Sequence, residues 1–127
     1  MKKEIIKSDN APAPIGPYSQ AVKVGHMVFL SGQVALDPAT GELHMDSIEI
    51  ETKQVMKNLE AVLVAAGSSF DQVVKSSIFL SSMNLFAEVN DIYATYFEGE
   101  APARETVAVK TLPKNVNVEI SMIALVS

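Results

Sequence analysis

The 127-residue chain contains no cysteine and no tryptophan, and it has one arginine beside nine lysines. Without cysteine it has no disulfide, no thiolate nucleophile and no thiolate metal ligand. No apolar run approaches the roughly 20 residues that span a bilayer, and the N-terminus lacks the apolar core of a signal peptide. A formal net charge of −5 disfavours nucleic acid, whose binding needs clustered lysine and arginine. These absences predict a cytoplasmic protein that binds neither membranes nor nucleic acid.

The composition is that of a folded domain. Hydrophobic residues make up 48% of the chain and charged residues 20%, whereas a disordered chain is poor in apolar residues. The length suits one domain, so residues 1–127 are expected to fold as a single unit without repeats or linkers. The proline-dense stretch 11–17 cannot form a helix or a central strand. It is therefore expected to be an ordered loop that leads into a strand.

Hydrophobic spacing predicts two helices. One apolar stripe with helical period covers residues 50–66 and ends before Gly67, and a second covers about 85–98. β-branched and alternating residues predict strands at the end of the proline-rich loop and at 27–31, 73–80, 104–110 and 116–126, with a further short strand at 4–7. The order β-β-α-β-α-β-β indicates an α+β fold, in which both helices cover one face of one sheet.

The other face of this sheet has no helix to cover it. It nevertheless carries Ile123, Leu125 and part of the strand around Phe29. A half-apolar uncovered face on a small sheet is typical of a partner surface. The sequence therefore predicts a homo-oligomer that assembles face to face with cyclic symmetry.

Arg104 and Glu119 are the side chains best suited to chemistry. A guanidinium can hold a carboxylate through two parallel hydrogen bonds, although Arg104 could instead form a surface or intersubunit salt bridge. Glu119 lies in an apolar strand, where a carboxylate must be paired, for instance with Arg104, or must face a wet cleft and hold a water. If the last two strands formed a hairpin, both residues would share one face with Thr106 and Ser121. Tyr18 could close such a pocket from a neighbouring subunit.

Other catalytic patterns are missing. The two histidines, His26 and His44, are far apart and lack the spacing of a metal motif. No nucleophile elbow, phosphate loop or dinucleotide fingerprint is present. Ser31 has no basic neighbour in the sequence, which disfavours serine nucleophilic catalysis. No metal site is predicted.

Seven short blocks follow one another along the chain in the order of a known family. They lie at residues 15–21, 29–34, 37–42, 86–93, 102–104, 112–114 and 118–120. The first block reads IGPYSQA. Together these blocks resemble the reactive intermediate deaminase family, also called RidA or YjgF, over essentially the whole chain.

The resemblance implies a chorismate-mutase-like α+β fold in a homotrimer with three clefts between subunits. It also implies hydrolysis of 2-imino acids, the tautomers of 2-aminoacrylate-type enamines, to 2-keto acids and ammonia without a cofactor or a metal. In this reading Arg104 binds the substrate carboxylate and Glu119 positions the hydrolytic water. The positions that match other cleft-lining residues of the family are Tyr18, Ser31, Gly32 and Asn90.

One departure from the family pattern follows the arginine. Archetypal members carry Ser-Cys there, whereas this chain has Glu105 and Thr106. Thr106 keeps a small polar group at the cysteine position, and Glu105 would neutralise Arg104 if it bent back to the same face. This departure supports an alternative, a non-catalytic protein that binds a keto acid or another metabolite. Ribonuclease activity, which is reported for some relatives, is a third hypothesis that the acidic charge disfavours.

Overall fold

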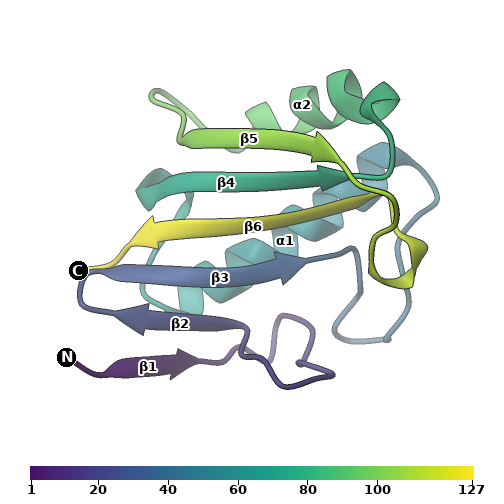
Figure 1. Cartoon of the computed structure of the whole chain (residues 1–127). Coiled ribbons are helices and arrows are strands. Elements are labelled where there is room, and N and C mark those ends of the chain that lie inside the picture. Colours follow the sequence, from purple (N-terminus) through teal and green to yellow (C-terminus); the bar gives the residue numbers. More distant parts are fainter.

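The computed structural model describes residues 1–127 and contains one six-stranded sheet with both helices on the same face (Figure 1). Three single 3₁₀ turns, at 70–72, 83–85 and 113–115, complete the regular structure. The α+β architecture predicted from the sequence is confirmed. The elements are β1 (Lys3–Ile6), β2 (Ala21–Val24), β3 (Met27–Gln33), α1 (Ile48–Ala65), β4 (Val73–Leu80), α2 (Phe86–Ala94), β5 (Ala103–Ala108) and β6 (Val118–Leu125).

The second helix is shorter than its apolar stripe. α2 ends at Ala94 rather than near Glu98. Tyr96 and Phe97 continue the stripe beyond the helix, where both rings pack edge-on against Phe70. Aromatic packing at the end of the sheet therefore explains residues that helical periodicity alone assigned to the helix.

The order of strands in the sheet is β1-β2-β3-β6-β4-β5. β6 pairs antiparallel with both β3 and β4, whereas β4 and β5 are parallel and are joined through α2. A parallel pair needs such a crossover, which a helix usually supplies. The last two strands therefore do not form the hairpin that a shared polar face would need, because β4 lies between β5 and β6.

The register across β4 decides which side chains share a face. Ile78 lies opposite Thr106 and is buried beneath the helices, so Thr106 and Arg104 belong to the helix-covered face. Phe79 lies opposite Glu119, which places Glu119 on the uncovered face. The prediction of one shared face is wrong for the set Arg104, Thr106, Glu119 and Ser121.

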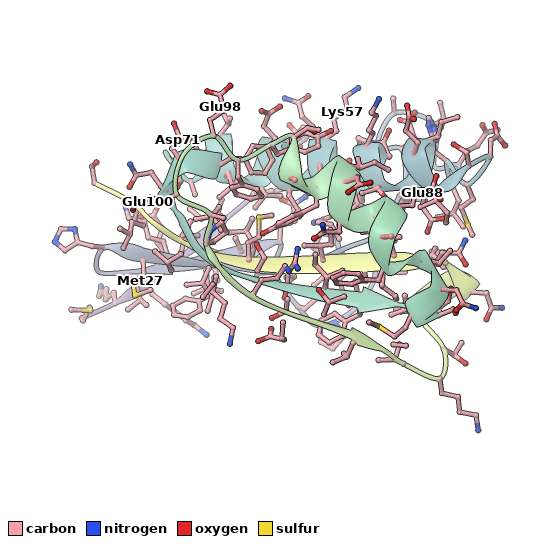
Figure 2. The ribbon with its side chains drawn as sticks, turned by 90° about the horizontal axis from the view of Figure 1, so that it is seen from above. Met27, Lys57, Asp71, Glu88, Glu98 and Glu100 are labelled. Atoms are coloured by element: carbon pink, nitrogen blue, oxygen red, sulfur yellow. The ribbon has the colours of Figure 1, made fainter.

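The core lies between the sheet and the two helices, with most of its helical residues from α1. Ser47 caps α1 by accepting a hydrogen bond from the backbone N–H of Ile50 at 3.0 Å. Figure 2 shows both helices packed on one side of the sheet. The stripe of α1 that faces the sheet is completely buried and includes Val55, Met56, Leu59, Val62 and Leu63.

The uncovered face is half-apolar, as the sequence predicted, and it also carries the charged side chains of Lys75 and Glu105. Ile5, Phe29, Val107 and Leu125 point from it and are between 41% and 54% exposed. Such a face favours a second protein surface over water, and the predicted oligomer remains a prediction. No helix of the structure has both the length and the apolar character to cross a bilayer.

Candidate functional site

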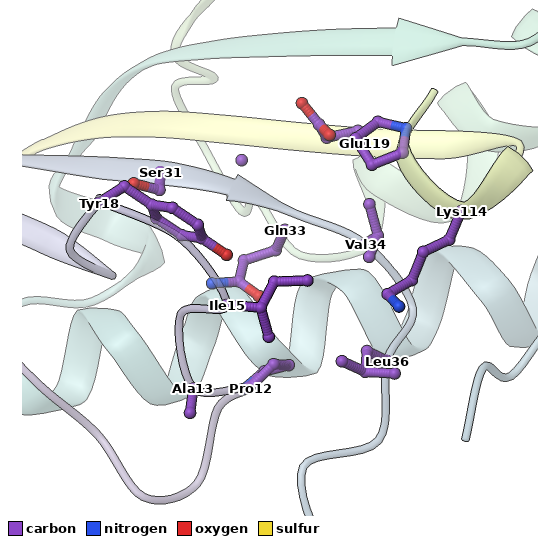
Figure 3. A pocket seen from close by; sticks show the side chains of 12 residues that line it. Pro12, Ala13, Ile15, Tyr18, Ser31, Gln33, Val34, Leu36, Lys114 and Glu119 are labelled. Atoms are coloured by element: carbon purple, nitrogen blue, oxygen red, sulfur yellow. The ribbon is translucent and has the colours of Figure 1, made fainter. Parts of the chain in front are cut away.

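A cavity of about 580 Å³ opens where β3 ends and β6 begins (Figure 3). Four of the residues singled out from the sequence line it together: Tyr18, Ser31, Gly32 and Glu119. We call this cavity the Glu119 pocket. Its remaining lining residues are Pro12, Ala13, Ile15, Gln33, Val34, Leu36, Pro113 and Lys114.

An irregularity in β3 shapes one wall of the Glu119 pocket. The register between β3 and β6 shifts between Leu30 and Gln33, so Ser31 and Gly32 occupy a bulge. Bulges re-aim side chains and are frequent beside functional sites. The Ser31 hydroxyl donates a hydrogen bond to the carbonyl of Ser19 at 2.6 Å. This bond fixes the loop that carries Tyr18 against the strand.

Glu119 is half-buried, and its carboxylate forms no salt bridge or hydrogen bond within the chain. Burial raises the pKa of its carboxyl above the ordinary value, because the charged form loses hydration. Gly32 permits its position, since a Cβ atom there would lie only 2.6 Å from Glu119 Oε2. The result is a carboxylate that is free to accept a proton or to hold a water.

Arg104 lines a different cavity, of about 450 Å³, between α2 and β5. Its Nη1 donates a hydrogen bond to Asn90 Oδ1 at 2.7 Å. Its Cζ lies 5.6 Å from the ring centre of Phe86 and 5.4 Å from that of Tyr93. Within the chain the guanidinium is therefore held by an amide and two aromatic rings and has no carboxylate partner. We call this cavity the Arg104 pocket.

Glu105 does not neutralise Arg104. It accepts a hydrogen bond from the Ser77 hydroxyl and forms a salt bridge of 3.0 Å with Lys75, both on the uncovered face. The Ser77 hydrogen bond, followed by Lys75, lowers the pKa of the Glu105 carboxyl. Strand alternation therefore separates the two charges, as the sequence predicted.

Thr106 lies on the helix-covered face but lines neither cavity. Its hydroxyl oxygen is buried without a hydrogen-bond partner. The two histidines also lie outside both cavities, and His44 instead pairs with Asp37 at 3.0 Å in the turn before α1. No group of three histidine, cysteine or acidic side chains is placed to hold a metal ion.

Lys114 is a pocket residue that sequence reasoning missed as a site residue. It adopts a left-handed backbone conformation, with φ of 58°, in the turn before β6. This conformation is uncommon for a residue other than glycine. The run from Leu112 to Asn115 contains proline and asparagine, which are typical turn residues, but nothing in it indicates that the turn borders the cavity.

The chain thus divides the predicted site residues into two groups. Tyr18, Ser31, Gly32 and Glu119 meet in one pocket, and Asn90 and Arg104 meet in the other. The two pockets share no lining residue, and Arg104 and Glu119 lie on opposite faces of the sheet. A single chain therefore does not bring the guanidinium and the free carboxylate to one ligand.

Comparison with known proteins covers nearly the whole chain. Residues 8–126 match the family model described as endoribonuclease L-PSP. A mouse protein named 2-iminobutanoate/2-iminopropanoate deaminase is 48% identical over 97% of this chain and 91% of its own. The crystal structure of YyfA from Yersinia pestis, a protein of the Rid family, has a TM-score of 0.96 and 48% identity over 98% of this chain and 100% of its own. The crystal structure of E. coli TdcF with bound serine has a TM-score of 0.93 and 38% identity over 98% of this chain and 99% of its own.

Proposed function

Because the chain belongs to the endoribonuclease L-PSP family, also called RidA or YjgF, we propose that it hydrolyses 2-imino acids to 2-keto acids and ammonia in the cytoplasm. Relatives from mouse and rat that are named as 2-imino acid deaminases are 48% and 45% identical to it. The observation that supports this best is that Arg104 and Glu119 both lack an ion-pair partner within the chain. The Arg104 guanidinium is therefore free to bind the substrate carboxylate, and the Glu119 carboxylate is free to hold a water.

The substrate carries both features that these residues recognise. A 2-imino acid has a carboxylate next to an electrophilic imine carbon. The fork of Arg104 would hold the carboxylate, and Asn90 already fixes one side of that fork. Holding the anion aligns the imine carbon with the attacking water, so orientation supplies much of the rate. The carbon is reactive enough that no metal or cofactor is required.

Glu119 would move the protons. Its carboxylate takes a proton from the water as the oxygen bonds to the imine carbon, and the imine nitrogen receives that proton. The carbinolamine so formed passes its hydroxyl proton by the same route to the nitrogen, the C–N bond breaks, and ammonia and the keto acid leave. Because burial raises the pKa of Glu119, it is a stronger base than an exposed carboxylate.

The reaction needs two copies of the chain. We propose that one copy brings its Arg104 pocket against the Glu119 pocket of the next, in a homotrimer with three such sites. The exposed apolar residues of the uncovered face support this assembly, because contact between copies would remove them from water. The net charge of −5 and the solitary arginine do not favour an RNA substrate.

The direct test follows the consumption of 2-iminobutanoate that an amino-acid oxidase generates in situ. The protein should accelerate the appearance of 2-oxobutanoate and ammonia over the reaction without it. Calorimetric binding of 2-oxobutanoate with no acceleration would instead support the metabolite-binding alternative. Cleavage of RNA that a site variant abolishes would support a ribonuclease.

Neutralising Glu119 should remove activity without destabilising the fold. The Glu119→Gln variant is expected to lose about 10²–10⁴-fold in kcat, the usual contribution of a general base. In wild type the pKa of Glu119 is raised in the folded state, so stability falls as pH rises from the unfolded pKa through the folded one. Above the folded-state pKa that destabilisation is fully present, and Glu119→Gln should therefore melt there at the same temperature as wild type or higher.

Thermal melts at pH 7 and pH 4 test this prediction, together with the pH profile of kcat/KM in wild type. The acid limb of that profile should lie above the ordinary pKa of glutamate. Glu105→Gln is the matched control, because Ser77 and Lys75 lower the pKa of Glu105, and neutralising it should not raise Tm. A Glu119→Gln variant that keeps wild-type kcat would contradict the assignment.

A methyl group at Gly32 should displace the Glu119 carboxylate. The added Cβ would lie 2.6 Å from Oε2 and 2.9 Å from Cδ, both in the movable end of the side chain. We expect Gly32→Ala to fold normally and to lose about 10–10²-fold in kcat, since a misplacement of about 1 Å costs that much. Gly41 has a φ of 75°, so Gly41→Ala is strained although its Cβ meets no atom within 4 Å, and it controls for a loss of stability that leaves the pocket unchanged. Equal activity of Gly32→Ala and wild type would argue that the position of Glu119 is unimportant.

A further inference from the structure

Glu51 is a completely buried carboxylate that the proposed reaction does not use. It lies in the first turn of α1, is 0% exposed and forms no salt bridge. Its Oε2 accepts the backbone N–H groups of Asn117 at 2.7 Å and Val118 at 3.0 Å. Its Oε1 accepts the side-chain amide of Asn117 at 3.0 Å. Three donors thus compensate a charge that would otherwise be costly to bury.

These donors belong to the beginning of β6. Asn117 and Val118 immediately precede Glu119, and the turn before them contains Lys114 and Asn115, both with left-handed backbone angles. Ser81, the residue that follows β4, also holds Asn117. The backbone N–H of Ser81 donates to the carbonyl of Asn117 at 3.0 Å, and its hydroxyl donates to Asn117 Oδ1 at 2.8 Å.

The start of a strand determines the face of every residue after it. Side chains alternate along β6, so anchoring Val118 toward α1 directs Glu119 to the opposite face, into the Glu119 pocket. A slip of one residue would turn Glu119 into the core. β4 pairs with β6 as far as Val118, but β3 pairs with it only as far as Ile120, so the first two residues of β6 have a strand partner on one side only.

We propose that Glu51 is a positioning residue, which fixes the first residues of β6 so that the Glu119 carboxylate faces the substrate pocket. This inference rests on the proposed function. Because Arg104 and Asn90 line a separate pocket, a change at Glu51 should alter the water-activating half of the reaction and leave carboxylate binding intact.

Two substitutions distinguish the geometry of Glu51 from its charge. Glu51→Leu keeps most of the side-chain volume but removes every acceptor. Glu51→Gln keeps one oxygen for the two backbone N–H groups. Its amide can donate to Asn117 if the Asn117 side chain rotates, because the Ser81 hydroxyl can accept as well as donate. Thr52→Val is the matched control, since Thr52 is the next residue of α1, is equally buried, and has a hydroxyl without a partner.

Wild type and these three variants should be compared by steady-state hydrolysis of 2-iminobutanoate and by calorimetric binding of 2-oxobutanoate. Glu51→Leu is expected to lose about 10–10²-fold in kcat, the cost of a misplaced catalytic group, with KM and 2-oxobutanoate affinity within about twofold of wild type. Glu51→Gln should recover most of kcat, and Thr52→Val should match wild type. Should Glu51→Leu fail to fold, Asn117→Ala replaces it, with a several-fold loss of kcat expected at unchanged KM.

A second readout does not depend on turnover. The Glu119 carboxyl can be titrated by ¹³C NMR, and its raised pKa should move toward the ordinary value in Glu51→Leu but not in Thr52→Val. If wild type hydrolyses no imine, the proposed function fails while this titration still tests the positioning. A folded Glu51→Leu variant with wild-type kcat and an unmoved Glu119 pKa would overturn the inference.

Discussion

Arg104→Ala is expected to lower kcat/KM for 2-iminobutanoate by about 10²–10³-fold, because truncating one partner of a desolvated charge pair costs about 2–5 kcal/mol. Arg104→Lys should recover only part of this loss. A lysine ammonium offers the charge but not the planar fork that holds both carboxylate oxygens and the Asn90 amide together. Steady-state kinetics measure the loss of kcat/KM in each variant, and calorimetry with 2-oxobutanoate measures the loss of carboxylate binding.

The loss of activity should not come from unfolding. Arg104 lies at the edge strand β5, and its contacts with Phe86 and Tyr93 are partly exposed, so their removal should cost only about 0.5–1 kcal/mol of stability. Lys53→Ala, which removes an exposed cation paired only with Glu49, should leave activity unchanged. Wild-type kcat/KM in a folded Arg104→Ala variant would eliminate the proposed role of the guanidinium.

The elements of the fold could be predicted because they depend on local periodicity. The stripe of α1 and the alternation in β5 and β6 follow from spacing along the chain. Spacing along the chain does not predict which strands pair with each other in the sheet. β6 is last in the sequence but lies third from one edge of the sheet, between β3 and β4. Long-range pairing of this kind leaves no periodic signal in either strand.

The same limit separated the residues of the candidate site. Alternation correctly grouped Arg104 with Thr106 in β5 and Glu119 with Ser121 in β6. The register of β4, which pairs with both strands, puts these two groups on opposite faces of the sheet. Predicting whether Arg104 and Glu119 share a face therefore requires knowing that β4 lies between their strands. Family resemblance supplied the residue types and the expectation of clefts between subunits, which hydrophobic patterning could not.

Glu51 carried a signal that could have been used. It lies four residues before Val55, on the buried stripe of α1. A charged residue on an apolar stripe must be hydrogen-bonded if the helix packs as its neighbours require. Its partners, Asn117 and Val118, lie 66 and 67 residues away, so the sequence indicated that donors must exist but not where they lie.

Two inactive variants should recover activity when they assemble together. In an equimolar mixture of Arg104→Ala and Glu119→Gln subunits, a site between copies takes its arginine from one subunit and its glutamate from the next. Half of the subunits supply each residue, so random mixing should restore about one quarter of wild-type specific activity in a ring with heterologous contacts. The mixture is made by co-refolding or by co-expression with two tags, and each variant alone is the baseline.

A second mixture separates sites between subunits from sites within one chain. Equimolar wild type and the double variant Arg104→Ala/Glu119→Gln should retain about one quarter of the activity if two subunits form each site, but about one half if each chain is self-sufficient. Because Arg104 and Glu119 lie on opposite faces of one sheet, we expect the mixture to retain about one quarter of the activity. Retention of one half, with no recovery in the mixture of single variants, would mean that the two residues never act on the same substrate from different copies.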